Sequence, residues 1–505
     1  MIKILPVEKI READAYTIEN EPIASVDLME RAARQCFKWV HKKKPKEKNI
    51  KIFCGTGNNG GDGLVIARLL AAKGYKCSVY VLRFSEKFSE DCSINLKRLE
   101  EIIEVNIMDI RDGDSLPEIL PTDLVIDAIF GSGLSKPVNK FPAALIDHIN
   151  GSGAVIIAID IPSGMFSDKL PDIKAGSIVS ADYTLTFQFP KLSFLFAESE
   201  QFVGEWHVLP IGLHPDYINA ASCSNFFVEP GDIAGLLKIR RRFAHKGTFG
   251  HALLIAGSYG KAGAAVLAAR ACMRSGAGLF TVHIPKKVYE IIQTAFPEAM
   301  VSIDDEEDFF SGIRETGPYH AIAIGPGIGM EEKTQNGLKL LIQNTRNPLI
   351  LDADALNILG ENKTWLSFLP PGSILTPHPR EFERLAGKAS DSLDRNEMQL
   401  TFSKKYNVYV ILKGAFTAIT TPDGKCFFNP TGNPGMATGG SGDALTGILL
   451  GLLAQGYTPL STCLLGTFIH GLAGDIAAKK KGFESLIASD IVESLGKAFR
   501  KLYAN

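Results

Sequence analysis

The segment KIFCGTGNNGGDGLVIARLLAAKG, residues 51–74, decides the fold of the first half of the chain. It opens with a nearly continuous apolar run (51–55), passes through a glycine-rich turn (55–63) and continues as an apolar helix pattern (64–74). Strand, glycine turn and helix in this order are typical of a βαβ unit with a parallel sheet. The glycines would let backbone N–H groups approach a phosphate. The alternative is a tight turn whose glycines serve only packing.

Similar apolar, β-branched runs recur along the rest of the chain, and they predict further buried parallel strands. In the first half they cover residues 78–82, 123–130 and 154–160, and in the second half 251–257, 278–284, 321–325, 348–354, 373–376 and 408–414. Helical patterns, such as 262–276 and 396–406, lie between them, and the chain from Asp443 onward is predicted to be helical. Both halves are therefore expected to have an α/β fold.

A polar stretch, residues 212–235, separates the two series of strands. We place the domain boundary within about 10 residues of position 220, because boundaries are the least precise part of such predictions. The expected domains are residues 1–218 and residues 225–505. A length of 505 residues is compatible with this division, since domains average about 150 residues.

Composition excludes several classes of protein. A hydrophobic content of 45% argues against disorder, and a net charge of −2 gives no overall basic field for nucleic acid. The basic cluster at 41–48 is interpreted as a solvated helix end and turn. Eight dispersed cysteines without a CxxC pair indicate free thiols in a reducing compartment. The N-terminus lacks a signal-like apolar core, and polar residues break the apolar stretch 444–473, so we predict a cytoplasmic protein that binds no membrane.

Two aspartates stand at the ends of predicted strands. Asp127 is followed by GSG (131–133), and Asp160 is followed by IPSG (161–164). Carboxyl ends of parallel strands meet at the ligand-binding edge of an open sheet, so both aspartates are expected to point toward one crevice. Together with the amides of Asn58 and Asn59 they could form an oxygen-rich site for a hard cation. The alternative for each aspartate is a cap on loop N–H groups.

The glycine-rich segment Asn429–Asp443 is the most specific feature of the second half. It delivers Asp443 to the first turn of a long helix, where free N–H groups form an anion hole. Asp443 could there take a proton from a hydroxyl that attacks a phosphoryl group. The alternative is a structural helix cap. No GxxxxGK[ST] motif occurs, so the chain is not a P-loop protein.

Four other residues of the second half have two interpretations each. His378 stands before Pro379 at a predicted helix cap, and it either faces solvent in a rigid turn or contacts a ring of the substrate. Lys413 ends a predicted strand, before a glycine turn that suits a nucleotide edge. Asp352 and Asp354 are interpreted first as helix-cap and switch-point residues and second as residues related to magnesium.

The motifs GTGNNGGDG (55–63), DAIFGSG (127–133) and IDIPSG (159–164) resemble the NAD(P)H-hydrate epimerase family over about residues 10–215. The resemblance implies a Rossmann-like three-layer fold, the substrates NADHX and NADPHX, and a bound potassium ion. It implies substrate contacts at Asn58, Asn59, Gly60, Gly61, Asp62, Gly131, Ser132, Gly133, Leu134, Ser135, Lys136, Pro137 and Asp160. It implies potassium ligands at Asn59, Asp127 and Ser163, and it makes Asp160 the candidate acid/base.

The glycine-rich segment Asn429–Asp443 resembles the ribokinase-like superfamily. More closely the second half resembles ADP/ATP-dependent NAD(P)H-hydrate dehydratases, over about residues 225–505. This closer resemblance rests on the glycine-rich segment together with HKGTFGHALLIAGS (245–258), AIGPGIG (323–329), LDADALN (351–357), LTPHPREFERL (375–385) and LKGAFT (412–417). The resemblance implies contacts to ADP or ATP, used with Mg²⁺, at Lys413, Gly414, Ala415, Phe416, Thr417 and Gly442. It implies contacts to the hydrate at Ala264, Gly327, His378 and the catalytic Asp443. Lys261 and Phe416 depart from the usual pattern of that family.

Together the two resemblances imply a cytoplasmic metabolite-repair enzyme that assembles as a symmetric homo-oligomer. The first domain would interconvert the R and S hydrates, and the second would return the S hydrate to NADH or NADPH through a phosphorylated intermediate. Two alternatives stay open at this point. One is a ribokinase-like kinase for a pyrimidine or sugar alcohol, fused to a ligand-binding domain. The other is a non-enzymatic scaffold, although the retained Asn59, Asp127 and Asp160 favour chemistry.

Overall fold

The computed structural model describes residues 1–43 and 48–504, and the chain divides into two compact units. One unit comprises Ile2–Cys223, and the other begins at Ser224. The basic cluster predicted at 41–48 lies largely outside the described residues. Its first residues end helix α2 (Ser25–Lys42).

The first unit contains a sheet in which every neighbouring pair of strands is parallel. Its strands are β2 (Ile50–Cys54), β3 (Cys77–Leu82), β4 (Asn106–Ile110), β5 (Leu124–Ala128), β6 (Val155–Ile159), β7 (Tyr183–Phe187) and β8 (Glu205–Leu209). Their spatial order is β4-β3-β2-β5-β6-β7-β8, so the direction of winding reverses between β2 and β5. This is the doubly wound, Rossmann-like arrangement, in which ligands bind at the point of reversal.

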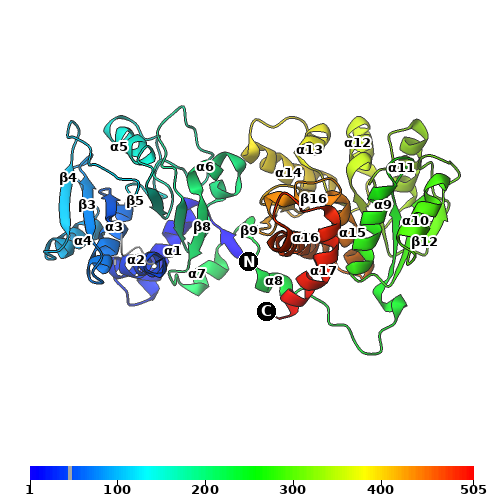
Figure 1. The fold of residues 1–505 in the computed structure, drawn as a ribbon, viewed down its shortest axis with the longest axis horizontal. Helices are drawn as coiled ribbons and strands as arrows, with labels where there is room; N and C mark the ends of the chain where they lie inside the picture. The colour runs from blue at the N-terminus through cyan, green and yellow to red at the C-terminus, as the bar shows by residue number, and fades with distance from the viewer. Residues whose placement is uncertain (44–47, 505) are drawn as a thin grey trace. The chain divides into compact units, whose positions relative to one another are not determined.

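Helices cover both faces of this sheet (Figure 1). The helices of the unit are α1 (Val7–Asn20), α2, α3 (Asn58–Ala71), α4 (Glu90–Glu100), α5 (Lys140–Asn150), α6 (Glu200–Val203) and α7 (Pro215–Ala220), and β1 (Ile2–Ile4) precedes them. Apolar side chains of α2, α3 and α4 pack on one face of the sheet, and those of α5 pack on the other. The unit therefore has three layers.

Helix α3 begins at Asn58, six residues before the predicted start at position 64. The glycines of the motif belong to its first turns, where they let the helix pack closely. A Cβ at Gly60 would lie 1.9 Å from the carbonyl oxygen of Gly55, and one at Gly63 would lie 2.6 Å from the Cβ of Ala128. Close packing thus accounts for these two glycines, because any side chain would collide with the neighbouring strands.

The second unit is built on a larger, mainly parallel sheet. Its strands follow the order β9-β18-β17-β16-β15-β14-β13-β10-β11-β12, and only β17 runs antiparallel to its neighbours. Their bounds are β9 (Asn225–Phe227), β10 (His251–Ile255), β11 (Leu279–Ile284), β12 (Met300–Ile303), β13 (Ala321–Ile324), β14 (Leu349–Leu351), β15 (Ile374–Leu375), β16 (Tyr409–Leu412), β17 (Ala418–Thr420) and β18 (Cys426–Phe428). The direction in which successive strands are added reverses between β10 and β13. The carboxyl ends of these two strands are therefore the expected ligand-binding edge of the sheet.

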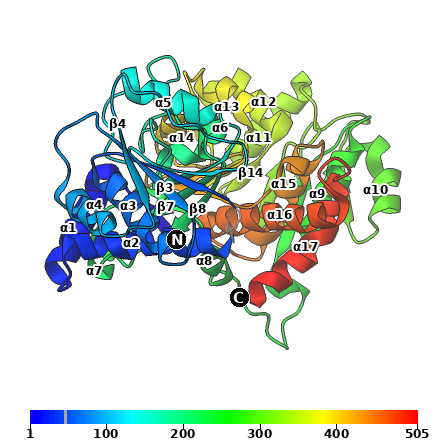
Figure 2. The same ribbon diagram turned by 60° about the vertical axis from the view of Figure 1, so that its left-hand side comes forward.

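Two groups of helices sandwich this sheet (Figures 1 and 2). One face is covered by α9 (Ala262–Arg274), α15 (Ser441–Ala454), α16 (Pro459–Lys481) and α17 (Ala488–Tyr503). The other is covered by α11 (Glu332–Asn344), α12 (Ala353–Glu361), α13 (Pro379–Ala386) and α14 (Ser392–Tyr406). The short helices α8 (Pro230–Ala234) and α10 (Tyr289–Ala295) complete the unit. The α/β fold predicted for both halves is confirmed.

Helices α9 and α15 are joined by a seam of glycines. A Cβ at Gly447 would lie 2.1 Å from the carbonyl oxygen of Ala268, and one at Gly451 would lie 2.5 Å from that of Cys272. The backbones of the two helices are therefore in direct contact. From Gly447 to Gly451 on α15 the contacting residue moves from Ala268 to Cys272 on α9, so the two helices run parallel. Helix α16 is long and apolar enough to cross a membrane, but 72% of its most apolar window is buried within the unit. It is a core helix here.

Candidate functional site

A cavity of about 590 Å³ opens at the carboxyl ends of β2 and β5 in the first unit. The start of α3, the loop after β5 and the residue after β6 meet there. Of the predicted substrate residues, the following line it: Asn58, Asn59, Asp62, Gly131, Ser132, Gly133, Leu134, Ser135, Lys136 and Asp160. Gly60 and Gly61 instead face the packing side of α3, against Gly55 and Met29. The three motifs thus converge on one cavity, at the reversal point of the sheet.

Asp127 was expected to point into this cavity, and this expectation is wrong. Its side chain is fully buried beneath the loop after β5 and does not line the cavity. Its carboxylate accepts the Ser163 hydroxyl at 2.6 Å and the Ser163 N–H at 2.8 Å, and the N–H of Phe130 donates to the same hydroxyl. Burial raises the pKa of Asp127 to about 6, against the lowering effect of these bonds.

Asn59 lies beside this pair. A Cβ at Gly131 would come within 3.1 Å of the Cβ of Asn59, which puts the amide next to the Phe130–Gly131 backbone. Both amide atoms of Asn59 are buried, and neither has a hydrogen-bond partner within the described residues. A buried amide without partners calls for a ligand. The oxygens of Asn59, Asp127 and Ser163 are of the kind that binds a hard monovalent cation, and such a cation would satisfy the amide oxygen of Asn59.

Asp160 follows β6 in the left-handed conformation, with φ of +64°, which is uncommon for a residue other than glycine. Its Oδ1 accepts the ammonium of Lys191 at 2.8 Å and the N–H of Phe187 at 3.3 Å. Burial acts to raise the pKa of Asp160, but the charge and hydrogen bond of Lys191 outweigh it and hold that pKa below its usual value. Asp160 is therefore an ionised carboxylate, able to accept a proton.

The other two carboxyls of the cavity behave in the opposite way. Burial, reinforced by the charges of Asp160 and Asp14, raises the pKa of Asp62 well above its usual value. Burial and Asp160 likewise raise the pKa of Asp14, on α1, to about 6. The cavity thus holds one aspartate whose pKa is lowered beside two whose pKa values are raised, and such divergent pairs can supply a base and an acid. Sequence reasoning missed Asp14 and Lys191.

In the second unit, Asp352 lies at the end of β14, and it connects the predicted nucleotide residues. Its Oδ1 accepts the ammonium of Lys413 at 2.7 Å, and its Oδ2 accepts the hydroxyl of Thr446 at 2.7 Å. Asp352 occupies the N-cap position of α12, but its side chain makes no capping hydrogen bond. Asp352 thus takes the cap position that the sequence predicts, but its side chain pairs with Lys413 instead of capping the helix.

Gly442 and Asp443 stand in the first turn of α15, directly beside this ion pair. A Cβ at Gly442 would lie 3.2 Å from the Nζ of Lys413, so the glycine keeps space open next to the ammonium. The first N–H groups of a helix have no partner within it, and here they adjoin a lysine. Burial, followed by the charge of Asp352, raises the pKa of Asp443 to about 6. A carboxyl with this pKa is suited to general base catalysis near neutral pH.

The predicted hydrate residues lie at the carboxyl ends of β10 and β13. Gly327 has φ of +65°, and a Cβ on it would lie 3.0 Å from the Cβ of Lys261 and 3.4 Å from that of Ala264. The loop therefore lies against the start of α9. Lys261 pairs with Asp354 at 3.2 Å, and Asp354 also accepts the N–H of Gly329. Asp354 thus fixes the two loops that enclose this side of the site.

His378 caps α13, as predicted. Its Nδ1 accepts the N–H groups of Arg380 and Glu381, while the carboxyl of Glu381 accepts the N–H of His378 at 2.8 Å. The imidazole is half-exposed, and its Nε2 lies 3.5 Å from Oε1 of the buried Glu381. The loop is joined to the nucleotide side, because the N–H of Lys413 donates to the carbonyl of Pro377. His378 thus lies on the same edge as Lys413.

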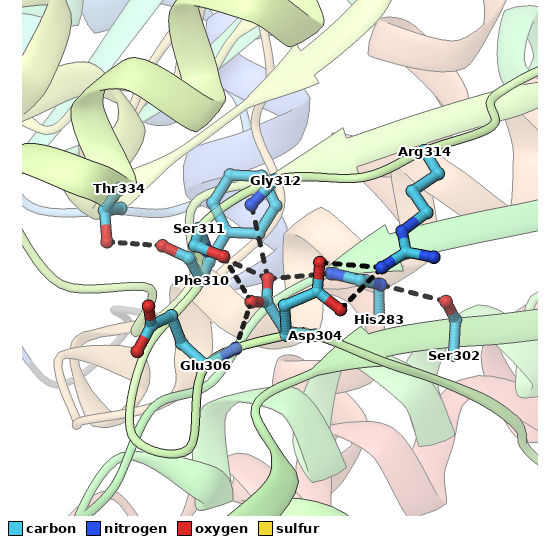
Figure 3. A network of polar contacts seen from close by, with 10 residues as sticks. His283, Ser302, Asp304, Glu306, Phe310, Ser311, Gly312, Arg314 and Thr334 are labelled. Carbon is cyan, nitrogen blue, oxygen red and sulfur yellow. Dashed lines mark hydrogen bonds and ion pairs between the residues drawn. The ribbon is translucent and has the colours of Figure 1, made fainter.

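A buried histidine–aspartate network supports the loop on the hydrate side (Figure 3). His283 bonds to Asp304 at 3.0 Å, and Asp304 also accepts the hydroxyl and the N–H of Ser311, which fixes the loop after β12. The carbonyl of Asp308 in this loop accepts the N–H of Tyr259 at 2.7 Å. The network therefore holds the turn that leads into α9. Among the described residues, no group of three or more His, Cys, Asp or Glu side chains could hold a metal ion.

Two family models match the chain, one in each unit. A model described as YjeF-related protein N-terminus matches residues 25–193, and one described as NAD(P)H-hydrate dehydratase matches residues 252–497. A solved ADP/ATP-dependent NAD(P)H-hydrate dehydratase from Bacillus subtilis, co-crystallised with ATP/Mg²⁺, is 32% identical. It covers 55% of this chain and 98% of its own, with a TM-score of 0.48.

Relatives also match along nearly the full length. The bifunctional NAD(P)H-hydrate repair enzyme Nnr of Moorella thermoacetica is 34% identical, over 99% of this chain and 97% of its own. The enzyme of the same name from Escherichia coli (strain K12) is 31% identical, over 97% of this chain and 92% of its own. Both resemblances inferred from the motifs are thereby confirmed. The chain belongs to the family of bifunctional NAD(P)H-hydrate repair enzymes.

Proposed function

We propose that this chain repairs hydrated NADH and NADPH through two sites. Residues 1–218 would interconvert the R and S hydrates, and residues 225–505 would dehydrate the S hydrate with ADP or ATP. The observation that carries the proposal is the presence of two separate clusters, each with a carboxyl whose ionisation suits proton transfer. Family membership along the whole chain favours this function over a simple kinase with a fused sensor.

In the first site, Asp160 accepts the proton of the C6 hydroxyl. The O–H electron pair then forms the C=O bond of an open-chain aldehyde, while the C6–N1 electron pair moves to the ring nitrogen. The chain end rotates, the nitrogen attacks the other face of the carbonyl, and Asp160 returns the proton. Gly131 to Lys136 would hold the pyrophosphate side, and Asn58, Asn59 and Asp62 would hold the ring side. A potassium ion held by Asn59, Asp127 and Ser163 would supply fixed positive charge beneath the loop.

In the second site, Asp443 takes the proton of the C6 hydroxyl while that oxygen attacks the terminal phosphoryl group of the nucleotide. The bond from phosphorus to the bridging oxygen breaks, and the shortened nucleotide leaves. The C6–O bond then breaks with phosphate as the leaving group, and loss of the C5 proton restores the reduced ring. Lys413 and Gly442, which are adjacent, would flank the transferred group. Ala264, Gly327 and His378 would hold the hydrate, and Gly414 to Thr417 the adenine nucleotide.

The accompanying Mg²⁺ would be held mainly by nucleotide phosphates. Both carboxylate oxygens of Asp352 already accept hydrogen bonds, which argues against a direct role for it as a ligand. Eight free cysteines, seven of them buried, support a reducing location such as the cytoplasm. We also propose that the chain assembles as a homo-oligomer, as most such enzymes do.

The decisive experiment incubates the full chain with mixed NADH-hydrate epimers and ADP or ATP, with and without K⁺. Complete conversion to NADH faster than spontaneous epimerisation would support both activities. Conversion of only the S fraction would support the second activity alone. No conversion with either nucleotide would refute the proposal.

A further inference from the structure

Lys191 is a buried cation that the proposed chemistry has not yet used. It follows β7 and is 1% exposed, yet its side chain contributes to the wall of the first cavity. Its ammonium donates to Asp160 Oδ1 at 2.8 Å and lies 3.5 Å from the carbonyl oxygen of Phe189. An ammonium removed from water is retained only where a partner compensates it, and Asp160 is that partner.

The ion pair fixes an unusual conformation. Asp160 is held with positive φ, and its N–H donates to the carbonyl of Leu185 at 2.8 Å. Three donors converge on its Oδ1: the Lys191 ammonium, the Phe187 N–H and the Thr186 hydroxyl at 3.4 Å. Lys191 is the only charged group of the three, so it contributes most to the orientation of the carboxylate.

Without Lys191 the surroundings would oppose ionisation of Asp160. The charged or titratable side chains near the pair are Arg11, Asp14, Asp62, Lys136 and Asp168. Three of these are carboxyls, which disfavour a further negative charge. Arg11 and Lys136 also line the cavity, but neither forms a hydrogen bond or ion pair with Asp160 in the described part of the chain.

We propose that Lys191 is a positioning residue of the epimerisation site, whose ammonium keeps Asp160 ionised and aimed into the cavity. The proposal rests on the proposed function of the first unit, in which Asp160 accepts the hydroxyl proton. Lys191 then acts through Asp160, while burial keeps the pKa of the neighbouring Asp62 raised. Removal of its charge should change the pH at which Asp160 becomes a competent base.

The test compares the full-length wild type with K191M, K191R and the control K174M, which replaces an exposed lysine of the same unit. Conversion of the R hydrate to the S hydrate is followed chromatographically between pH 5 and 8, in K⁺ and without nucleotide. In the wild type kcat should show no acid limb from Asp160 in this range, because the pKa of Asp160 lies below its usual value. In K191M an acid limb should enter the range, since loss of an adjacent opposite charge raises a carboxyl pKa by about 1 to 3 units and burial is then unopposed. K191R and K174M should keep the wild-type profile, and KM should change little in any variant.

A K191M profile that coincides with the wild-type profile would overturn the proposal. A wild type that does not epimerise the hydrate would instead refute the proposed function, so the two failures are distinguishable. If K191M fails to fold, as judged by circular dichroism, K191Q carries the same test. The carboxyl ¹³C resonance of Asp160, assigned with D160N, gives a measure independent of turnover. It should titrate at higher pH in K191Q, and an unchanged titration would count against the proposal.

Discussion

Replacement of Asp443 by Asn should abolish most of the dehydration step while preserving the shape of the site. The side chain lies in the first turn of α15, and burial with the nearby Asp352 raises the pKa of its carboxyl to about 6. An amide cannot accept the hydroxyl proton. A positioned general base contributes about 10²- to 10⁴-fold in rate. The expected loss of kcat therefore corresponds to about 3 to 5 kcal/mol of transition-state stabilisation.

The assay uses the S hydrate with saturating ADP or ATP and follows the ultraviolet absorbance of NADH. In the wild type, kcat should rise with pH through about 6 and then level off, because Asp443 must lose its proton to act as a base. The variant D443N should be slow and should lack this acid limb. D305N, at an exposed position of the same unit, serves as the control and should behave as the wild type. Wild-type kcat in D443N, or an acid limb that persists in it, would refute the assignment.

Three further variants examine other parts of the structure. D352N removes a negative charge beside Asp443, so the pKa of Asp443 should fall and the acid limb of dehydration should move to lower pH. It also removes the partner of Lys413, so KM for the nucleotide should rise. A pH series of initial rates would measure both effects. Epimerisation should be faster in K⁺ than in Na⁺, and N59A should lose that difference; equal salt responses in both proteins would contradict the cation site. G447A should lower the free energy of unfolding by about 3 kcal/mol in urea titrations, because its Cβ would meet a backbone oxygen. G496A, with open space around its Cβ on the exposed face of α17, should instead raise that free energy by about 0.5 kcal/mol.

Much of the fold could be predicted because buried parallel strands have a strong signature. Runs such as 123–130 and 154–160 are mostly apolar and rich in β-branched residues, and β5 and β6 lie within them. The start of α3 was misplaced because glycine disfavours helices. In this fold the need for close packing against β2 outweighs that preference.

The candidate sites were predicted in part, and what was missed has a common cause. Motif residues that are close in sequence could be grouped, whereas partners from distant segments could not. Lys191 is 31 positions from Asp160, and Thr446 is 94 positions from Asp352, so only the folded sheet brings each pair together. One signal was available: Lys191 is the single charged residue in the apolar run 183–196, where an unpaired charge would be costly.

The contact between α9 and α15 limits how the second site can move. Because bare backbone meets bare backbone at Gly447, the two helices cannot slide or part without losing dense packing. One helix starts beside the predicted hydrate residues Ala264 and Gly327, and the other carries the proposed base Asp443, so the dense packing limits changes in the separation between these ends. Substrate entry and product exit must then depend on rearrangement of the connecting loops. An inhibitor that contacts the starts of both helices would bind a preformed, rigid site. Its affinity should therefore depend strongly on the length of the linker between its two binding groups.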